Sequence, residues 1–149
     1  MLGGLKLSVD GEARELHAQM TYKAVLVEDV PNLAWIFGYT NAPWTLKSDL
    51  AGEYLIRLFR HMDEHGHTVA TPRDKENSAL DIGMVDGLQS GYVQRAKDTF
   101  PRQGSKNPWR VLMHYGKDSK MLVEDPIDDG LLQFDARVVT APVLDGAVA

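Results

Sequence analysis

The chain has 149 residues, of which 44% are hydrophobic and 25% charged, a composition typical of a folded domain rather than a disordered chain. The net charge of −5 argues against a nucleic-acid-binding protein, and the lack of cysteine excludes disulfides, zinc–thiolate sites, iron–sulfur clusters and cysteine nucleophiles. Because no apolar run approaches the about 18 residues that span a bilayer, and no signal peptide is recognisable at Met1–Gly4, we expect a cytoplasmic protein.

The N-terminal region has the pattern of a β-hairpin. Residues 5–9 alternate between apolar and polar, Asp10-Gly11 favours a tight turn, and residues 13–19 would form the return strand. A short extended segment is expected at Ala24–Val27. The sequence therefore predicts a hairpin over residues 5–19.

A strand, a loop and a long helix are predicted next, over Asn32 to Gly66. Leu33–Phe37 is uniformly apolar and is bounded by proline and glycine, which indicates a strand buried on both faces. From Leu46 onward, apolar residues recur every three or four positions, as on the buried face of a helix. We expect Thr45 or Asn41 to cap this helix and Gly66 to end it.

The remainder of the chain has a weaker pattern. We expect a surface loop over 71–78, a short helix over 90–99, another loop over 101–108 and a frayed tail over 141–149. Leu131–Phe134 could be a last strand, whereas Trp109–Tyr115 is ambiguous between helix and extended chain. The predicted fold class is therefore α/β, in the mixed α+β sense, with a loop-rich C-terminal region and short helices.

The loop between the predicted strand and helix is the first candidate site. A helix N-terminus offers free amide groups to an electronegative ligand, and Thr40, Asn41, Thr45 and Trp44 surround it. A plain strand–helix connection explains the same pattern equally well, because such units are common.

Two other groups of residues could bind ligands. His61 and His65 have metal-ligand spacing, but Met62 stands where the zinc-protease motif needs glutamate, so a solvated helix end is the favoured interpretation. Arginines and aromatics in 91–95 and 101–110 could clamp an anion, although packing and surface charge are the more common explanation.

Several catalytic motifs are absent from the sequence. It contains no G-x-G-x-x-G fingerprint, no Walker loop and no G-x-S-x-G elbow. We therefore assign no catalytic residue and no metal site.

Three stretches of the chain resemble a known family in the same order. PNLAWIFGYTNAPWTLKSDL (31–50), SGYVQR (90–95) and PRQGS through PWR (101–110) are similar to the C-terminal part of flavin-containing monooxygenases of the Baeyer–Villiger type, in particular the ethionamide-activating group. Such proteins use FAD and NADPH to insert oxygen into ketones or to oxidise sulfur. The resemblance implies a C-terminal fragment that is inactive alone, because the glycine fingerprints that bind both cofactors are missing.

The resemblance also implies domains and site residues. Residues 1–66 would be the C-terminal part of an FAD-binding, Rossmann-like domain, and residues 67–149 a loop-rich extension packed on it. Trp44 and Leu46 would line the pocket of a small organic substrate, and Pro43 stands where relatives commonly carry a small residue such as serine. The implied FAD-binding residues are Gly38, Thr40, Asn41, Thr45, Leu46, Lys47 and Asp49.

A different class of function is an association module. The apolar face of the long helix and the predicted buried strand would both need partners. A separately encoded N-terminal half of the monooxygenase could supply them. No nucleic-acid partner and no metal are expected.

Overall fold

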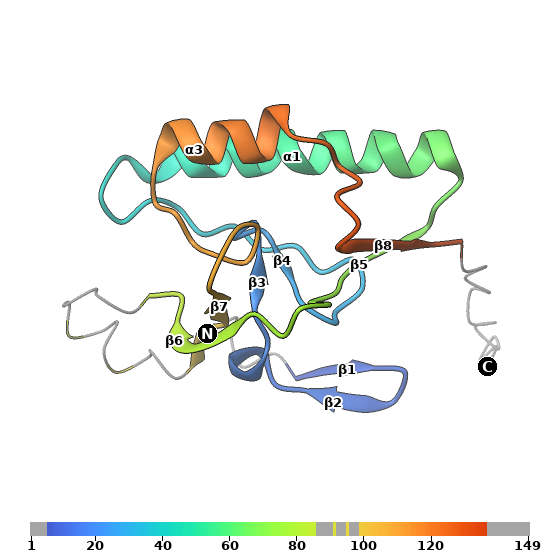
Figure 1. Ribbon diagram of the computed structural model, residues 1–149, viewed down its shortest axis with the longest axis horizontal. Coiled ribbons are helices and arrows are strands. Elements are labelled where there is room, and N and C mark those ends of the chain that lie inside the picture. Colours follow the sequence, from blue (N-terminus) through green and yellow to red (C-terminus); the bar gives the residue numbers. More distant parts are fainter. Residues whose placement is uncertain (1–5, 86–90, 92–94, 96–98, 137–149) are drawn as a thin grey trace, which may run out of the picture.

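The computed structural model describes residues 6–85, 91, 95 and 99–136, which form a mixed α+β structure (Figure 1). One long helix, α1 (Trp44–His65), lies beside a shorter helix, α3 (Tyr115–Ser119), which continues into a π-helical turn at Lys120–Glu124. The described strands form two-stranded antiparallel sheets: β1 (Leu7–Val9) with β2 (Glu12–Arg14), β3 (Thr21–Tyr22) with β4 (Leu26–Val27), β5 (Val69–Pro72) with β8 (Leu132–Asp135), and β6 (Ala79–Gly83) with β7 (Arg102–Gly104).

The predicted N-terminal hairpin is confirmed, with a shorter return strand than expected. Asp10 and Gly11 both have positive φ, 52° and 86°, as the tight turn between β1 and β2 requires. The return strand ends at Arg14, and Leu16–Ala18 forms a 3₁₀ turn instead. The predicted extended segment at Ala24–Val27 is also partly wrong, because Lys23 and Ala24 form the turn between β3 and β4 with positive φ.

The predicted buried strand at Leu33–Phe37 is wrong. The segment is extended, but within the described residues its one strand-like contact is the bridge between Ala34 and Leu26, where the Trp35 amide donates to the Val25 carbonyl (2.9 Å). Its neighbour β4 is only two residues long, so no ladder of hydrogen bonds can form on that side. Trp35 is buried, whereas Ala34 and Ile36 on the opposite face are exposed.

The long helix is confirmed and begins at Trp44, close to the predicted start. Its end is as predicted: Gly66 adopts the left-handed conformation (φ 68°), and its amide bonds to the Asp63 carbonyl. One row of apolar residues faces the core, namely Leu50, Ala51, Tyr54, Leu58 and Met62. Part of the predicted second row is not buried, because Phe59 is 58% exposed.

The second half of the chain contains more strand than its sequence predicts. The surface loop expected at 71–78 is wrong at its start, since Thr71 and Pro72 are buried in β5. The loop expected at 101–108 is partly wrong, because it contains strand β7. The last strand, predicted at Leu131–Phe134, is confirmed as β8, which begins and ends one residue later. Most of the helix expected at 90–99 and the whole tail at 141–149 lie outside the described residues.

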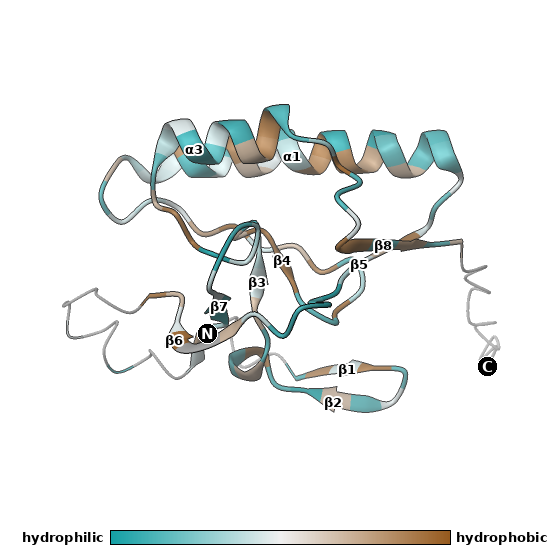
Figure 2. Ribbon diagram, viewed as in Figure 1, coloured by the Kyte–Doolittle hydropathy of each residue, from teal (hydrophilic) through white to brown (hydrophobic). Residues whose placement is uncertain are grey.

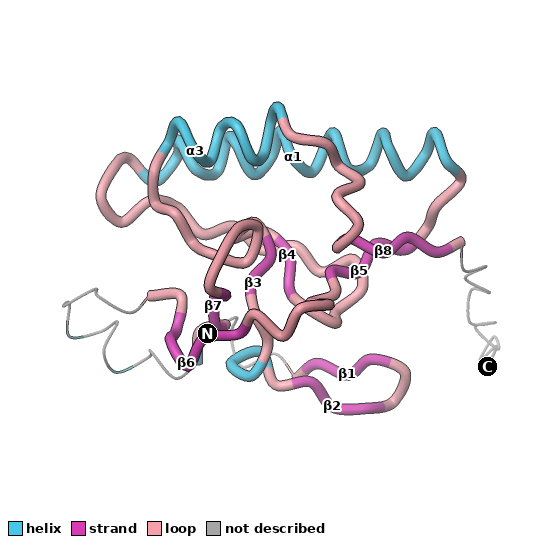
Figure 3. The backbone as a smooth tube through the Cα atoms, viewed as in Figure 1, coloured by secondary structure: helices cyan, strands magenta, loops and turns pink. Residues whose placement is uncertain are grey.

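The helices form one layer and the short strands the other (Figure 3). The main core lies between these layers and includes residues from both halves of the chain, such as Tyr22, Tyr54, Trp109, Leu122 and Leu132. Figure 2 shows brown and teal turns along α1, because its apolar and charged residues occupy different faces. A second cluster around Val27, Trp35 and Val85 packs against the N-terminal hairpin.

None of the helices among the described residues combines the length and the apolar character that crossing a bilayer requires.

Two glycines of α1 allow a paired test of the helix. Gly66→Ala should destabilise the protein by about 1 kcal/mol, because alanine is strained at φ 68°. Gly52→Ala should stabilise the isolated chain by about 0.5–1 kcal/mol, because a Cβ at this mid-helix position meets nothing within 4 Å. Chemical denaturation followed by circular dichroism measures both changes. Equal effects of the two variants would contradict the observed helix end.

Candidate functional site

The predicted cofactor loop packs closely against the first residue of α1. A Cβ added to Gly38 would lie 2.1 Å from Cδ2 of Trp44, so the indole ring occupies the space that only glycine leaves at position 38. The Trp44 ring also meets the Phe37 ring edge-on, with centroids 5.3 Å apart. Trp44 is still half exposed, and this places one aromatic face beside the loop.

The start of α1 has no side-chain cap, so the predicted caps are wrong. Pro43 occupies the N-cap position, and no side chain accepts a hydrogen bond from the first turn. Asn41 lies two residues before the N-cap position, where its Nδ2 donates to the Met113 carbonyl (3.0 Å), and Thr45 lies inside the helix. The helix start is therefore exposed beside Thr40, Asn41 and Thr45, with Leu46 and Asp49 also on the surface.

Lys47 does not face this loop surface. Its side chain is 2% exposed and forms an ion pair with Asp118 of α3, with Nζ 2.7 Å from Oδ1. The Tyr39 hydroxyl donates to Oδ2 of the same carboxylate (2.8 Å), and the His114 amide also donates to Oδ2 (3.2 Å). Burial lowers the pKa of Lys47, while Asp118 opposes that shift, and burial followed by Asp118 raises the pKa of Tyr39.

The sequence contained a signal for this inward orientation. Lys47 precedes Leu50, Ala51 and Tyr54 by three, four and seven residues, which places it on the apolar face of α1. Its partner Asp118 could not be identified from the sequence, because it lies 71 positions further along the chain, in a short helix that was not predicted.

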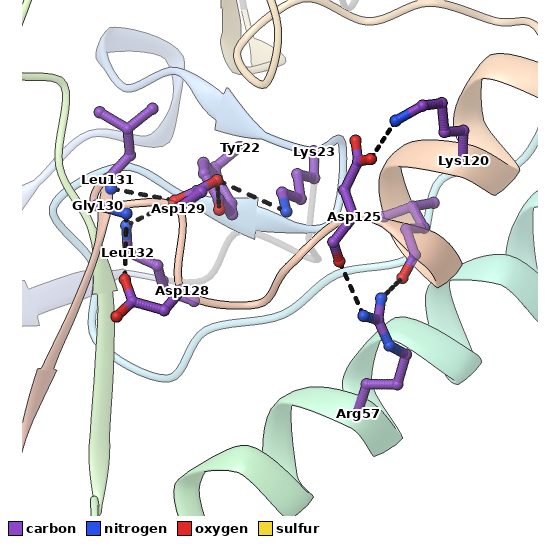
Figure 4. Close-up of polar contacts among 11 residues, drawn as sticks. Tyr22, Lys23, Arg57, Lys120, Asp125, Asp128, Asp129, Gly130, Leu131 and Leu132 are labelled. Atoms are coloured by element: carbon purple, nitrogen blue, oxygen red, sulfur yellow. Dashed lines mark hydrogen bonds and ion pairs between the residues drawn. The ribbon is translucent and has the colours of Figure 1, made fainter.

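A second polar cluster, missed by the sequence analysis, includes Tyr22 and Lys23 at the turn between β3 and β4 (Figure 4). The Tyr22 hydroxyl donates to Oδ2 of Asp129 (2.5 Å), and Nζ of Lys23 lies 3.6 Å from the same oxygen. The Lys23 ammonium also lies over the rings of Tyr22 and Tyr54, at 5.4 and 5.2 Å from their centroids. The other Asp129 oxygen accepts the amides of Leu131 and Leu132.

The electrostatic environment of this cluster is set mainly by burial. Burial lowers the pKa of Lys23, and the carboxylates of Asp129 and Asp125 oppose that shift. Burial, then the neighbouring Tyr54 and Asp129, raises the pKa of Tyr22. A cavity of 230 Å³ adjoins the cluster and is lined by Lys23, Asn107, Pro108, Met121, Asp125, Pro126 and Asp129.

Arg57 connects α1 to the same region. Its guanidinium donates to the carbonyl of Leu122 (2.6 Å) and to that of Asp125 (2.8 Å), the latter labelled in Figure 4. The Asp125 carboxylate in turn pairs with Lys120. Since these charged groups bind one another, the cluster joins segments that are distant in the sequence.

The histidines at the end of α1 stack on one another. The His61 and His65 ring centroids are 4.3 Å apart, and His67 stacks on Phe134 at 5.1 Å. Nδ1 of His65 lies 2.8 Å from the His61 carbonyl oxygen, so this nitrogen contacts the main chain. No group of three or more potential metal ligands is found in the part of the chain that the structure describes.

The third candidate, the arginines and aromatics of 91–110, is only partly covered by the described residues. Trp109 is buried and packs edge-on against Tyr22, with centroids 5.3 Å apart. Arg95 is exposed, and Tyr92 lies outside the described residues. Packing, the more common explanation, is confirmed for Trp109.

The chain is similar to several bacterial flavoproteins. It is 67% identical over 136 residues to FAD-containing monooxygenase MymA of Mycobacterium tuberculosis, covering 91% of this chain and 28% of that protein. It is 40% identical to FAD-binding monooxygenase AlmA of Acinetobacter baylyi (94% of this chain, 28% of AlmA) and 36% identical to FAD-containing monooxygenase EthA of M. tuberculosis (96% of this chain, 29% of EthA). The resemblance to flavin-containing monooxygenases is thus confirmed, and the chain spans about 28% of the length of these relatives.

No family model matches the chain. No solved structure matches it either.

Removing Lys47 should be far more costly than removing a surface lysine. Lys47→Ala leaves the Asp118 carboxylate buried without its cation, and we expect a loss of about 3–5 kcal/mol of unfolding free energy. The matched control is Lys106→Ala, which breaks the exposed pair with Glu76 and should cost less than about 1 kcal/mol. Urea denaturation measures both. Similar losses would show that the buried pair has no special role.

Stability should fall steeply above about pH 10. The folded protein raises the pKa of Tyr22, Tyr39 and Tyr54 above the ordinary value of 10.0, so the unfolded chain loses these protons first as the pH rises. Their contribution is fully present below pH 10 and is lost above it. The two buried lysines act in the opposite sense, since a lowered lysine pKa makes stability rise with pH up to about 10.5.

Tyr22→Phe isolates the tyrosine contribution. It should lower the melting temperature at pH 7, because the hydrogen bond to Asp129 is lost, and it should flatten the decline between pH 10 and 11. Thermal melts by circular dichroism across this range give the result. The matched control is Tyr115→Phe at a half-exposed position, which should keep the wild-type profile, and an equally steep decline in Tyr22→Phe would contradict the assignment.

Proposed function

We propose that this chain is the C-terminal portion of an FAD- and NADPH-dependent monooxygenase of the Baeyer–Villiger type, which oxidises ketones or organic sulfur in the cytoplasm and is inactive as this portion alone. The observation that carries the proposal is the 67% identity to MymA across 91% of this chain, combined with coverage of only 28% of MymA. This combination supports a chain that corresponds to only part of an FAD-containing monooxygenase.

The loop at the start of α1 fits one wall of a flavin site. Exposed Thr40, Asn41 and Thr45 surround a helix start that no side chain caps, an arrangement that favours an electronegative group. We retain Leu46 and Asp49 in the proposed FAD-contacting set, and Trp44 with Leu46 as the proposed substrate-side surface. Gly38 is buried against the Trp44 ring, so it supports the loop rather than contacting the cofactor.

Lys47 does not fit that role. Its ammonium is buried against Asp118, so it supports the loop from the inside rather than binding a cofactor directly. Tyr39 and Asn41 hold the same loop to α3 and Met113. When bound, FAD supplies the oxygen-transfer chemistry. The loop that Lys47, Tyr39 and Asn41 hold in place would position the ring system of FAD.

The absence of the glycine fingerprints from the sequence supports inactivity of the isolated chain. The pyrophosphate of FAD needs a glycine-rich turn at a helix N-terminus, and no G-x-G-x-x-G is present in these 149 residues. The proposed division at residue 66 would separate the FAD-domain portion from the extension that carries Trp109 and Asp118.

A direct assay tests the proposal. The purified chain should show no flavin absorbance near 450 nm after incubation with FAD and desalting, and no NADPH oxidation with a ketone or thioether substrate. Full-length MymA is the positive control in the same assay. Tight FAD binding together with NADPH-dependent turnover by the isolated chain would contradict the proposal.

A further inference from the structure

The helices α1 and α3 begin beside each other, at the same end of the helical layer (Figure 1). Lys47 is the fourth residue of α1 and Asp118 the fourth of α3, and these two residues form the buried ion pair. The first residues of the two helices, Trp44 and Tyr115, therefore each precede the pair by three positions. Residues three apart on a helix are neighbours, so the ion pair holds both aromatic residues at the same end of the molecule.

The main chain around Tyr115 is fixed by contacts of its neighbours. The Met113 carbonyl accepts Nδ2 of Asn41 (3.0 Å), and Met113 has a φ of 48°, a conformation uncommon for residues other than glycine. Nδ1 of His114 accepts the Lys117 amide (3.3 Å) and so caps α3. The position of Tyr115 beside the loop that precedes α1 is thus set without any contribution from its own side chain.

The side chain of Tyr115 is half exposed and is not used by the described chain. No ring contact and no hydrogen bond of this side chain is found in residues 6–85, 91, 95 and 99–136. Its exposed fraction of 51% is close to the 50% of Trp44, and Leu46 in the first turn of α1 is 37% exposed. A group of exposed apolar side chains at one place is typical of a binding surface.

Two aromatic rings at one end of the molecule suit a planar ligand. Tyrosine and tryptophan rings form offset-stacked or edge-on contacts with another aromatic ring, and these contribute beyond the burial of apolar area. A saturated ring of the same size gains the burial alone. Trp44 is already fixed, because Phe37 meets its ring edge-on and Gly38 leaves room for it. This arrangement favours a flat aromatic group over a saturated one.

We propose that Tyr115 contacts the substrate together with Trp44, and that Tyr115 favours substrates in which a planar aromatic ring adjoins the ketone or the sulfur atom. The inference rests on the proposed function, which assigns Trp44 and Leu46 to the substrate-side surface. The ring of Tyr115 is the contact, and its hydroxyl takes no part in the oxidation. Tyr115 is therefore a specificity-determining residue rather than a catalytic one.

A chimera of a full-length monooxygenase tests this role. The 136 residues of MymA that match this chain are replaced by those of this chain, and FAD content and steady-state NADPH oxidation are measured. The substrates are methyl phenyl sulfide and methyl cyclohexyl sulfide, which differ only in whether the ring is aromatic. Tyr115→Leu keeps apolar bulk but removes the aromatic ring. It should raise the KM for the phenyl sulfide about fivefold, and change kcat and the KM for the cyclohexyl sulfide less than about twofold.

Two further variants serve as controls. Tyr115→Phe keeps the ring, so both KM values should stay within about twofold of those of the unsubstituted chimera. Lys117→Ala changes an exposed position two residues further along α3 and should also leave both KM values unchanged. Unchanged KM values in Tyr115→Leu, or equal increases for both sulfides, would overturn the inference. An increase in Tyr115→Phe as large as that in Tyr115→Leu would also overturn it, since the hydroxyl would then be the contact.

Flavin content and turnover separate this inference from the proposed function. A chimera that binds no FAD or shows no turnover contradicts the proposed function, and the inference falls with it. A flavin-containing, active chimera in which Tyr115→Leu leaves the preference for the phenyl sulfide unchanged contradicts the inference alone.

Discussion

The buried ion pair between Lys47 and Asp118 determines how the first turn of α1 sits in this protein. Two charges without solvent are tolerated only when they are paired and bonded, so neither residue can leave the other without a large free-energy cost. The same carboxylate accepts the Tyr39 hydroxyl and the His114 amide. The loop before α1 and the segment before α3 are consequently fixed by one side chain.

Arg57 and the Tyr22–Lys23–Asp129 cluster fix the middle of α1 in a similar way. Arg57 reaches two carbonyls around the π-helical turn, and Lys23 lies between the Asp129 carboxylate and the Tyr54 ring. The buried row of α1 thus packs entirely on its own chain. The flank that carries Ile56 and Phe59 is left exposed.

The similarity to FAD-containing monooxygenases gives these contacts a functional context. In a chain that spans about 28% of MymA, an exposed helix start beside Thr40 and Asn41 is one wall of a proposed flavin site rather than a complete pocket. The ion pair of Lys47 and the hydrogen bonds of Tyr39 and Asn41 hold this loop to α3 and Met113. These contacts define the position of the loop before α1, although we assign no catalytic residue to the chain.

Local patterns in the sequence determined the hairpin turn at Asp10-Gly11, the length of α1, its end at Gly66 and the last strand, because each depends on neighbouring residues or helical spacing. The tertiary structure alone decided the rest. Leu33–Phe37 is not a sheet strand because its neighbour is too short, the inward-facing Lys47 is paired because Asp118 reaches it from 71 positions away, and β5 forms because β8 returns beside it. Pairings between such distant segments leave no periodic trace in either one, so composition and spacing could not reveal them.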